Sequence, residues 1–74
     1  MKIHERIRSL REDRDLNQTQ VAQYLHTSQT VYSRYERNER TLPAEYLYEL
    51  CRFYNVSADY ILGFTNEIKP LPKK

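Results

Sequence analysis

Residues that interrupt regular structure are nearly absent from most of this chain. Its single glycine is Gly63, and its prolines are residues 43, 70 and 72. Because glycine and proline disfavour helix interiors more than any other residue, their scarcity between residues 1 and 62 favours helices. The 74 residues make one domain, and a domain of this size buries only roughly 60% of the surface that its unfolded chain exposes. We therefore expect a single small core and little room for a deep substrate cleft.

The balance of residue types is that of a soluble globular domain with a weak basic bias. Hydrophobic residues make up 39% of the chain and charged residues 30%, and the net charge is +2. A charge this small is compatible with nucleic-acid binding but is not diagnostic of it. The basic residues gather at the start and in the middle of the chain: Lys2, Arg6, Arg8, Arg11, Arg14, Arg34, Arg37 and Arg40.

Several classes of protein are disfavoured by what the sequence lacks. A single cysteine, Cys51, excludes an intrachain disulfide, and no apolar run reaches the ~18 residues of a membrane span. The charged N-terminus does not resemble a signal peptide, so we expect a cytoplasmic protein without a membrane. His4, His26 and Cys51 lack metal-ligand spacing, and no glycine-rich phosphate loop or nucleophile motif is present. We expect no metal, no cofactor and no enzymatic activity.

Apolar spacing and capping residues predict the first two helices. Ile3, Ile7 and Leu10 are four and three residues apart, which predicts a helix over about residues 2–14. Asn17 followed three residues later by Gln20 is the pattern of a capping box. A second helix is therefore expected over about residues 18–25, with its inward side formed by Val21, Ala22 and Leu25.

A third helix is predicted to follow after a short turn. Ser28 is a suitable N-cap for a helix over about residues 29–37, whose inner side would carry Val31, Tyr32 and Tyr35. Two helices joined by three or four residues form the helix-turn-helix unit. Asn38 is expected to adopt a left-handed conformation at the end of this helix.

Two further helices complete the prediction. Pro43 suits the first position of a helix over about residues 43–54, although Leu42 would then be a poor cap. Asn55 ends that helix, Ser57 caps a last short helix, and Gly63 stops it. We predict an all-α, compact five-helix bundle over residues 1–64, followed by a flexible tail over residues 65–74. The inward side of the fourth helix would carry Leu47, Leu50, Cys51 and Tyr54.

Three segments of the chain together resemble a known family. They read Leu16-Asn17-Gln18-Thr19-Gln20-Val21-Ala22-Gln23-Tyr24-Leu25, Ser33-Arg34-Tyr35-Glu36-Arg37 and Val56-Ser57-Ala58-Asp59-Tyr60-Ile61-Leu62-Gly63, with Ser28 between the first two. This pattern is similar to the phage-repressor or Cro-type helix-turn-helix family, also called the xenobiotic-response-element (XRE) family, over about residues 3–64. The resemblance implies a λ-repressor-like fold and transcriptional regulation by operator binding, commonly as a dimer. The family usually has glycine where this chain has His26, Asn38 and Asn55, which predicts a strained turn at His26.

The resemblance also implies roles for individual positions. Base edges would be met by Gln29, Thr30, Ser33 and Arg34. A phosphate would be held by Gln18, and Arg11 with Glu36 would form a partly buried structural ion pair. Other phosphate contacts are expected from Thr19 on one side of the groove and from Arg37, Asn38 and Arg40 on the other.

The residue types at these positions suit the chemistry. The amide of Gln29 offers a donor and an acceptor that match adenine N6 and N7, and Arg34 can bind guanine or a phosphate. The methyl group of Thr30 suits thymine. The alternative is that these polar side chains merely form the solvated face of a helix.

The aromatic residues have two interpretations. Helical spacing predicts that Tyr32, Tyr35, Tyr54 and Tyr60 belong to the core rather than stack on bases. The remaining set is a candidate dimer surface or is simply partly exposed. It comprises Tyr46, Tyr48, Phe53, Ala58, Ile61 and Phe64.

Two functional hypotheses follow. The first is a sequence-specific regulator of transcription, a repressor that binds double-stranded DNA at a two-fold related operator as a homodimer through residues 29–37. The second is an interaction module, antitoxin-like or associated with a larger regulator, whose main partner is another protein bound through the fourth helix or the tail.

Overall fold

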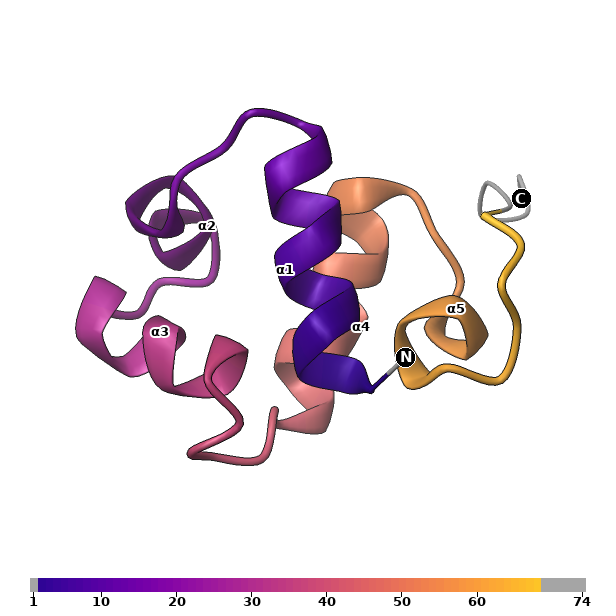
Figure 1. Cartoon of the computed structure of the whole chain (residues 1–74). Helices are drawn as coiled ribbons and strands as arrows, with labels where there is room; N and C mark the ends of the chain where they lie inside the picture. The colour runs from indigo at the N-terminus through magenta and orange to yellow at the C-terminus, as the bar shows by residue number, and fades with distance from the viewer. Residues whose placement is uncertain (1, 69–74) are drawn as a thin grey trace.

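The computed structural model describes residues 2–68 and is helical (Figure 1). The described part contains five helices and no strand, as the sequence predicted. Each helix begins and ends within two residues of its predicted bounds. The helices are α1 (Ile3–Asp13), α2 (Gln18–Tyr24), α3 (Gln29–Glu36), α4 (Ala44–Tyr54) and α5 (Ala58–Leu62).

The caps that mark the helix starts form the expected hydrogen bonds. At α2, Asn17 Oδ1 accepts from the backbone N–H of Gln20, and Gln20 Oε1 accepts from the N–H of Asn17, both at 2.8 Å. The Ser28 and Ser57 hydroxyl groups each accept a backbone N–H three residues later, at 3.1 Å. These bonds satisfy donors that a helix start leaves without partners, so the sequence fixes where α2, α3 and α5 begin.

The start of α4 differs from the prediction. Pro43, expected as the first helical residue, is instead the N-cap, with an extended ψ of 147°. Its carbonyl already accepts the first helical bond, from Leu47 N at 3.0 Å, but its side chain offers no capping acceptor. The helix therefore begins at Ala44, one residue later than predicted.

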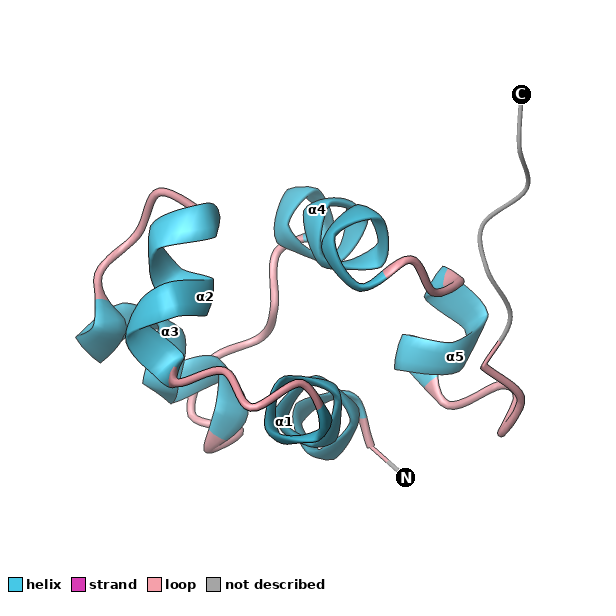
Figure 2. Ribbon diagram, turned by 90° about the horizontal axis from the view of Figure 1, so that it is seen from above, coloured by secondary structure: helices cyan, strands magenta, loops and turns pink. Residues whose placement is uncertain are grey.

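The helices surround one core. α1 and α4 lie centrally, α2 and α3 lie on one side, and α5 lies on the other (Figures 1 and 2). α1 packs against both α3 and α5, so it links the two sides. The largest fully buried side chains are Ile7, Leu10, Val21, Tyr32, Leu50, Val56 and Ile61. The four tyrosines expected in the core, Tyr32, Tyr35, Tyr54 and Tyr60, are all buried.

Left-handed residues end or separate the helices. Asn38 (φ 60°) adopts the left-handed conformation that the sequence predicted, and Asn55 (φ 55°) and Gly63 (φ 88°) also have positive φ where their helices were predicted to end. His26, in the turn between α2 and α3, has a φ of 58°, and Asp15 was not predicted to have its φ of 55°. A left-handed conformation costs a residue with a side chain roughly 1–2 kcal/mol, and this cost is smaller for asparagine and aspartate than for most residues. The strain expected at the turn is therefore located at His26.

The expected tail is tied to the body where it begins. Asn66 Oδ1 accepts a hydrogen bond from the guanidinium of Arg6 in α1, and this guanidinium also lies 4.2 Å from the centroid of the Tyr60 ring. Arg6 is buried as a result. The rest of the predicted tail, residues 69–74, lies outside the described residues.

No helix among residues 2–68 combines the length and apolar character needed to cross a membrane.

Candidate nucleic-acid interface

α3 has one buried side and one exposed side. Tyr32, Tyr35 and Glu36 face the core, whereas Gln29 and Thr30 in the first turn are exposed. Arg34 is exposed one turn later, on the same side as Thr30 because residues four apart are neighbours on a helix. The buried side fixes the helix in place, and the N-terminal part of its outer side offers an amide, a hydroxyl and a guanidinium.

Ser33 does not belong to this exposed set. It is only 8% exposed, and its hydroxyl donates to the carbonyl oxygen of Thr30 at 3.0 Å. The structure therefore gives no support to the predicted base contact of Ser33, because this side chain is turned toward the body of the protein and its hydroxyl donor is already used.

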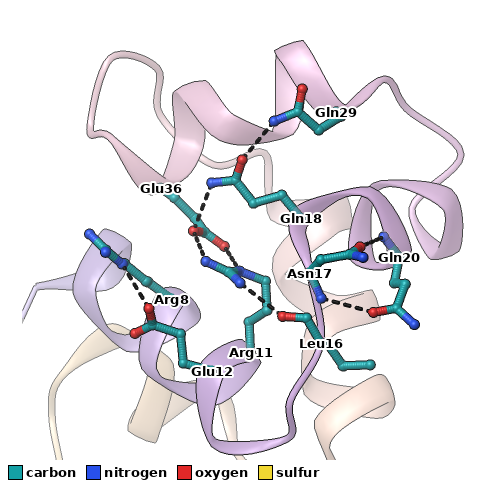
Figure 3. Close-up of polar contacts among 9 residues, drawn as sticks. All are labelled: Arg8, Arg11, Glu12, Leu16, Asn17, Gln18, Gln20, Gln29 and Glu36. Atoms are coloured by element: carbon teal, nitrogen blue, oxygen red, sulfur yellow. Dashed lines mark hydrogen bonds and ion pairs between the residues drawn. The ribbon is translucent and has the colours of Figure 1, made fainter.

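Gln18 and Gln29 are brought together by the crossing of α2 and α3. Gln29 Nε2 donates to Gln18 Oε1 at 2.7 Å, and Gln18 Nε2 donates to Glu36 Oε1 at 3.1 Å (Figure 3). Sequence reasoning gave the two glutamines separate roles and missed their contact. The sequence did contain a signal for this contact: α2 and α3 each begin with a glutamine.

Arg11 and Glu36 form the ion pair that the resemblance implied. Arg11 Nε lies 2.8 Å from Glu36 Oε2, and Arg11 Nη2 lies 3.0 Å from Glu36 Oε1. Arg11 Nη1 also donates to the carbonyl of Leu16 at 2.8 Å (Figure 3). The Glu36 side chain is 2% exposed and that of Arg11 is 12% exposed, so the pair is largely shielded from water.

Hydrogen bonds and the charge of Arg11 outweigh burial in setting the pKa of Glu36. Burial by itself raises the pKa of Glu36, but the side chains of Arg11, Tyr32 and Gln18 stabilise the carboxylate and lower the pKa below its ordinary value. The bond to Glu36 raises the pKa of Arg11. Burial also raises the pKa of the Tyr32 phenol. Glu36 is therefore an ionised carboxylate at neutral pH.

The predicted phosphate-binding residues flank the exposed side of α3. Thr19 is exposed in the first turn of α2, and Arg37, Asn38 and Arg40 are exposed where α3 ends. Arg37 Nε lies 3.0 Å from Glu39 Oε2, so its charge is already partly compensated. Exposed pairs of this kind are weak and leave the guanidinium free to exchange partners.

The candidate dimer surface is only partly a surface. Phe64 is 80% exposed and Ala58 is exposed, whereas Tyr46 and Phe53 are half-buried. Phe53 packs on Tyr24 with ring centroids 4.3 Å apart. Tyr48, also named in the prediction, is 61% exposed, and the exposed apolar residues that the prediction omitted are Leu62 and Ile68.

Ile61 is excluded from that surface. It is 0% exposed, so the prediction that it contributes to a dimer surface is wrong. The physical reason is that α5 packs against both α1 and α4, and Ile61 lies on the side they cover.

The family model that describes helix-turn-helix proteins matches residues 7–61. The chain belongs to the Cro/C1-type helix-turn-helix family. The matched range begins within α1 and extends through most of α5, and it includes every residue of the helix-turn-helix itself.

Curated relatives carry names of the same kind. The chain is 36% identical to the HTH-type transcriptional regulator YobD of Bacillus subtilis (strain 168), over 89% of this chain and 59% of the relative. It is 33% identical to the HTH-type transcriptional regulator ImmR of the same organism, over 85% of this chain and 50% of the relative. The chain thus spans between half and three fifths of the length of these relatives.

Solved structures share the fold. The P22 c2 repressor, crystallised with a synthetic operator, superposes with a TM-score of 0.76 at 29% identity, covering 84% of this chain and 94% of the repressor chain. A transcriptional regulator from Listeria innocua superposes with a TM-score of 0.81 at 22% identity, covering 92% of this chain and 64% of the other. The second match shows the fold alone.

Within residues 2–68, no group of three or more histidine, cysteine or acidic residues is placed to hold a metal ion.

Proposed function

We propose that this chain is the DNA-binding domain of a transcriptional repressor and that α3 enters the major groove of an operator. The observation that carries the proposal is the two-sided character of α3: its inner face is locked into the core, while Gln29, Thr30 and Arg34 are exposed on its outer face. The major groove is wide enough to admit one α-helix. The operator complex of the structurally similar P22 c2 repressor supports this assignment.

Each exposed side chain has a base edge that it suits. Gln29 offers one acceptor and amide donors to adenine, Thr30 offers its methyl group to thymine, and Arg34 offers two parallel donors to guanine. A good bidentate contact discriminates against the wrong base by roughly 1–3 kcal/mol. We assign the base readout to these three exposed residues and not to Ser33, which is buried.

Phosphate contacts would position α3 without reading sequence. Gln18 and Thr19 lie at the start of α2, where backbone N–H groups and a positive helix end favour an anion. Arg37, Asn38 and Arg40 lie beyond the other end of α3. Contacts on both sides of the groove fix the register of the helix, and they make binding strongly dependent on salt.

We also propose that two copies bind a two-fold related operator. The exposed Ala58 begins α5 and the exposed Phe64 follows its end. α5 lies on the opposite side of the bundle from α2 and α3 (Figure 1). An interface there would leave the α3 of each copy free for DNA. Half-sites one DNA turn apart, about 34 Å, are the spacing that such dimers read. A role on DNA agrees with the expected cytoplasmic location.

A second candidate function rests on a different surface. An apolar groove lies between the end of α2 and the start of α4, and its lining includes Tyr24, Tyr46 and Tyr48 with Glu45 and Glu49 at polar positions. Tyr48 is exposed, whereas Tyr24 and Tyr46 are half-buried. A groove lined by partly exposed aromatic side chains is typical of protein-binding sites. This groove favours an interaction module, with a protein partner at the fourth helix, as the second candidate function.

In vitro selection of DNA sites tests the main proposal directly. We expect enrichment of a discrete two-fold related site. Binding to that site should weaken steeply with salt, by roughly 10³–10⁵ between 50 and 200 mM for a dimer that contacts 6–10 phosphates. Affinity that follows charge alone, without an enriched site, would favour the interaction module.

A further inference from the structure

The orientation of the Gln18 amide is dictated by Glu36. An ionised carboxylate can only accept hydrogen bonds, whereas an amide has a donor end and an acceptor end. Gln18 must therefore turn its NH2 group toward Glu36, and the structure has Gln18 Nε2 donating to Glu36 Oε1 at 3.1 Å. The carbonyl oxygen of Gln18 is left pointing the other way. Arg11 holds the carboxylate in place through two hydrogen bonds.

The same constraint passes to Gln29. Because Gln18 presents its oxygen, Gln29 must present a donor, and Gln29 Nε2 donates to Gln18 Oε1 at 2.7 Å (Figure 3). One of the two amide hydrogens of Gln29 is consumed by this bond. The exposed part of Gln29 that remains is one N–H donor and one carbonyl acceptor.

We propose that Glu36 is a positioning residue that makes Gln29 select adenine over guanine, although Glu36 itself is too deeply buried to touch DNA. Adenine presents one acceptor (N7) and one donor (N6) in the major groove, which match the remaining acceptor and donor of Gln29. Guanine presents two acceptors (N7 and O6), and binding both would require both amide hydrogens of Gln29. One of these hydrogens is already donated to Gln18. This inference rests on the proposed function, since it requires α3 in the major groove.

Replacing the carboxylate with an amide releases the constraint. In Glu36→Gln, the side chain at position 36 can show Gln18 either an oxygen or an NH2 group. When position 36 shows its NH2 group, Gln18 can reverse its own amide and turn its NH2 group toward Gln29. Gln29 then accepts this hydrogen bond through Oε1. Both amide hydrogens of Gln29 remain available to a base. The two acceptors of guanine then become acceptable partners. We expect the ratio of affinities for adenine over guanine to fall by roughly five-fold or more.

The experiment measures Kd for the full chain on duplexes that differ only in the base pair read by Gln29. That pair is identified as the position whose preference disappears in Gln29→Ala. The proteins compared are the wild type, Glu36→Gln, Gln29→Ala and the double variant. Glu12→Gln is the matched control, because it removes the same charge from an exposed pair with Arg8 that does not contact the glutamines.

We expect only the preference for adenine over guanine at the position read by Gln29 to change. Glu36→Gln should lower the adenine-to-guanine ratio in the wild-type background and leave it unchanged in the Gln29→Ala background. Glu12→Gln should change all affinities alike and leave the ratio at the wild-type value. An unchanged ratio in a folded Glu36→Gln protein would overturn the inference while leaving the proposed function intact, whereas a wild type without any base preference would overturn both.

A second variant covers the case in which Glu36→Gln does not fold. Gln18→Leu breaks the chain of amides at its middle and leaves the Arg11–Glu36 ion pair in place. Loss of a phosphate contact from Gln18 would weaken all duplexes equally, so the ratio again isolates the effect on Gln29. The ratio should fall as in Glu36→Gln, and a wild-type ratio would overturn the inference.

Discussion

Arg11 and Glu36 join α1 to α3 through two hydrogen bonds, with Nε–Oε2 at 2.8 Å and Nη2–Oε1 at 3.0 Å. The two bonds use the planar fork of the guanidinium, a geometry that lysine cannot reproduce. The pair therefore ties the C-terminal end of α3 to α1. Since Glu36 also contacts Gln18, the same carboxylate belongs both to the fold and to the proposed reading surface.

Removing one partner of this pair should be strongly destabilising. Arg11→Met leaves the Glu36 carboxylate buried without its countercharge, and we expect the free energy of unfolding to fall by about 3–5 kcal/mol. Urea denaturation followed by circular dichroism measures this change. Arg8→Met is the control, since Arg8 pairs with Glu12 at 63% and 53% side-chain exposure and should cost at most about 1 kcal/mol. Equal losses in the two variants would show that the Arg11 pair contributes no more than a surface pair.

Acid should destabilise the protein through Glu36. Its pKa is lowered from 4.5 in the folded state, so the pair stabilises the fold above the ordinary pKa and loses this contribution as the pH falls through the folded pKa. We expect the free energy of unfolding to decline below about pH 4.5. The decline should be smaller in Arg11→Met/Glu36→Leu, which replaces both charges. Urea denaturation between pH 7 and pH 3 compares the two proteins, and parallel curves would contradict the assignment.

The turn between α2 and α3 should be improved by glycine. His26 is exposed at a φ of 58°, where a Cβ atom is unfavourable. His26→Gly relieves roughly 1–2 kcal/mol of strain and loses roughly 0.5–1 kcal/mol to the greater freedom of the unfolded chain. We expect a net gain of about 0.5–1 kcal/mol in thermal or urea denaturation. Asn38→Gly should gain less, because asparagine tolerates this conformation, and an equal gain at both sites would count against strain at His26.

Phe64 and Ile61 should affect different properties. Phe64→Ser alters an 80% exposed side chain, so stability should change by less than about 0.5 kcal/mol while self-association weakens. Ile61→Ala opens a cavity in the core and should cost about 2–5 kcal/mol of folding free energy. Sedimentation of wild type and Phe64→Ser, free and on operator DNA, measures the association. A wild type that remains monomeric in both conditions would refute the proposed dimer.

Local sequence determined the helices and their ends. The bonds that start α2, α3 and α5 join residues only three positions apart, as in Asn17 with Gln20 and Ser28 with Val31. The left-handed residues at Asn38 and Asn55 follow from side chains that tolerate positive φ. Such features depend on neighbouring residues, so a single sequence contains the information to predict them. The resemblance then supplied the expected roles of Gln29, Thr30 and Arg34.

Tertiary structure decided which side chains remain available. Ser33 and Ile61 are buried because of how α3 and α5 lie against the other helices. The resemblance had placed Ser33 at a base edge, and Ile61 had been named as part of a candidate dimer surface. The Gln18–Gln29 contact joins residues eleven positions apart, and the Arg6–Asn66 contact joins residues sixty positions apart. Contacts at such separations depend on the angles between helices, which arise from the packing of the whole core and are not encoded in any short stretch of sequence.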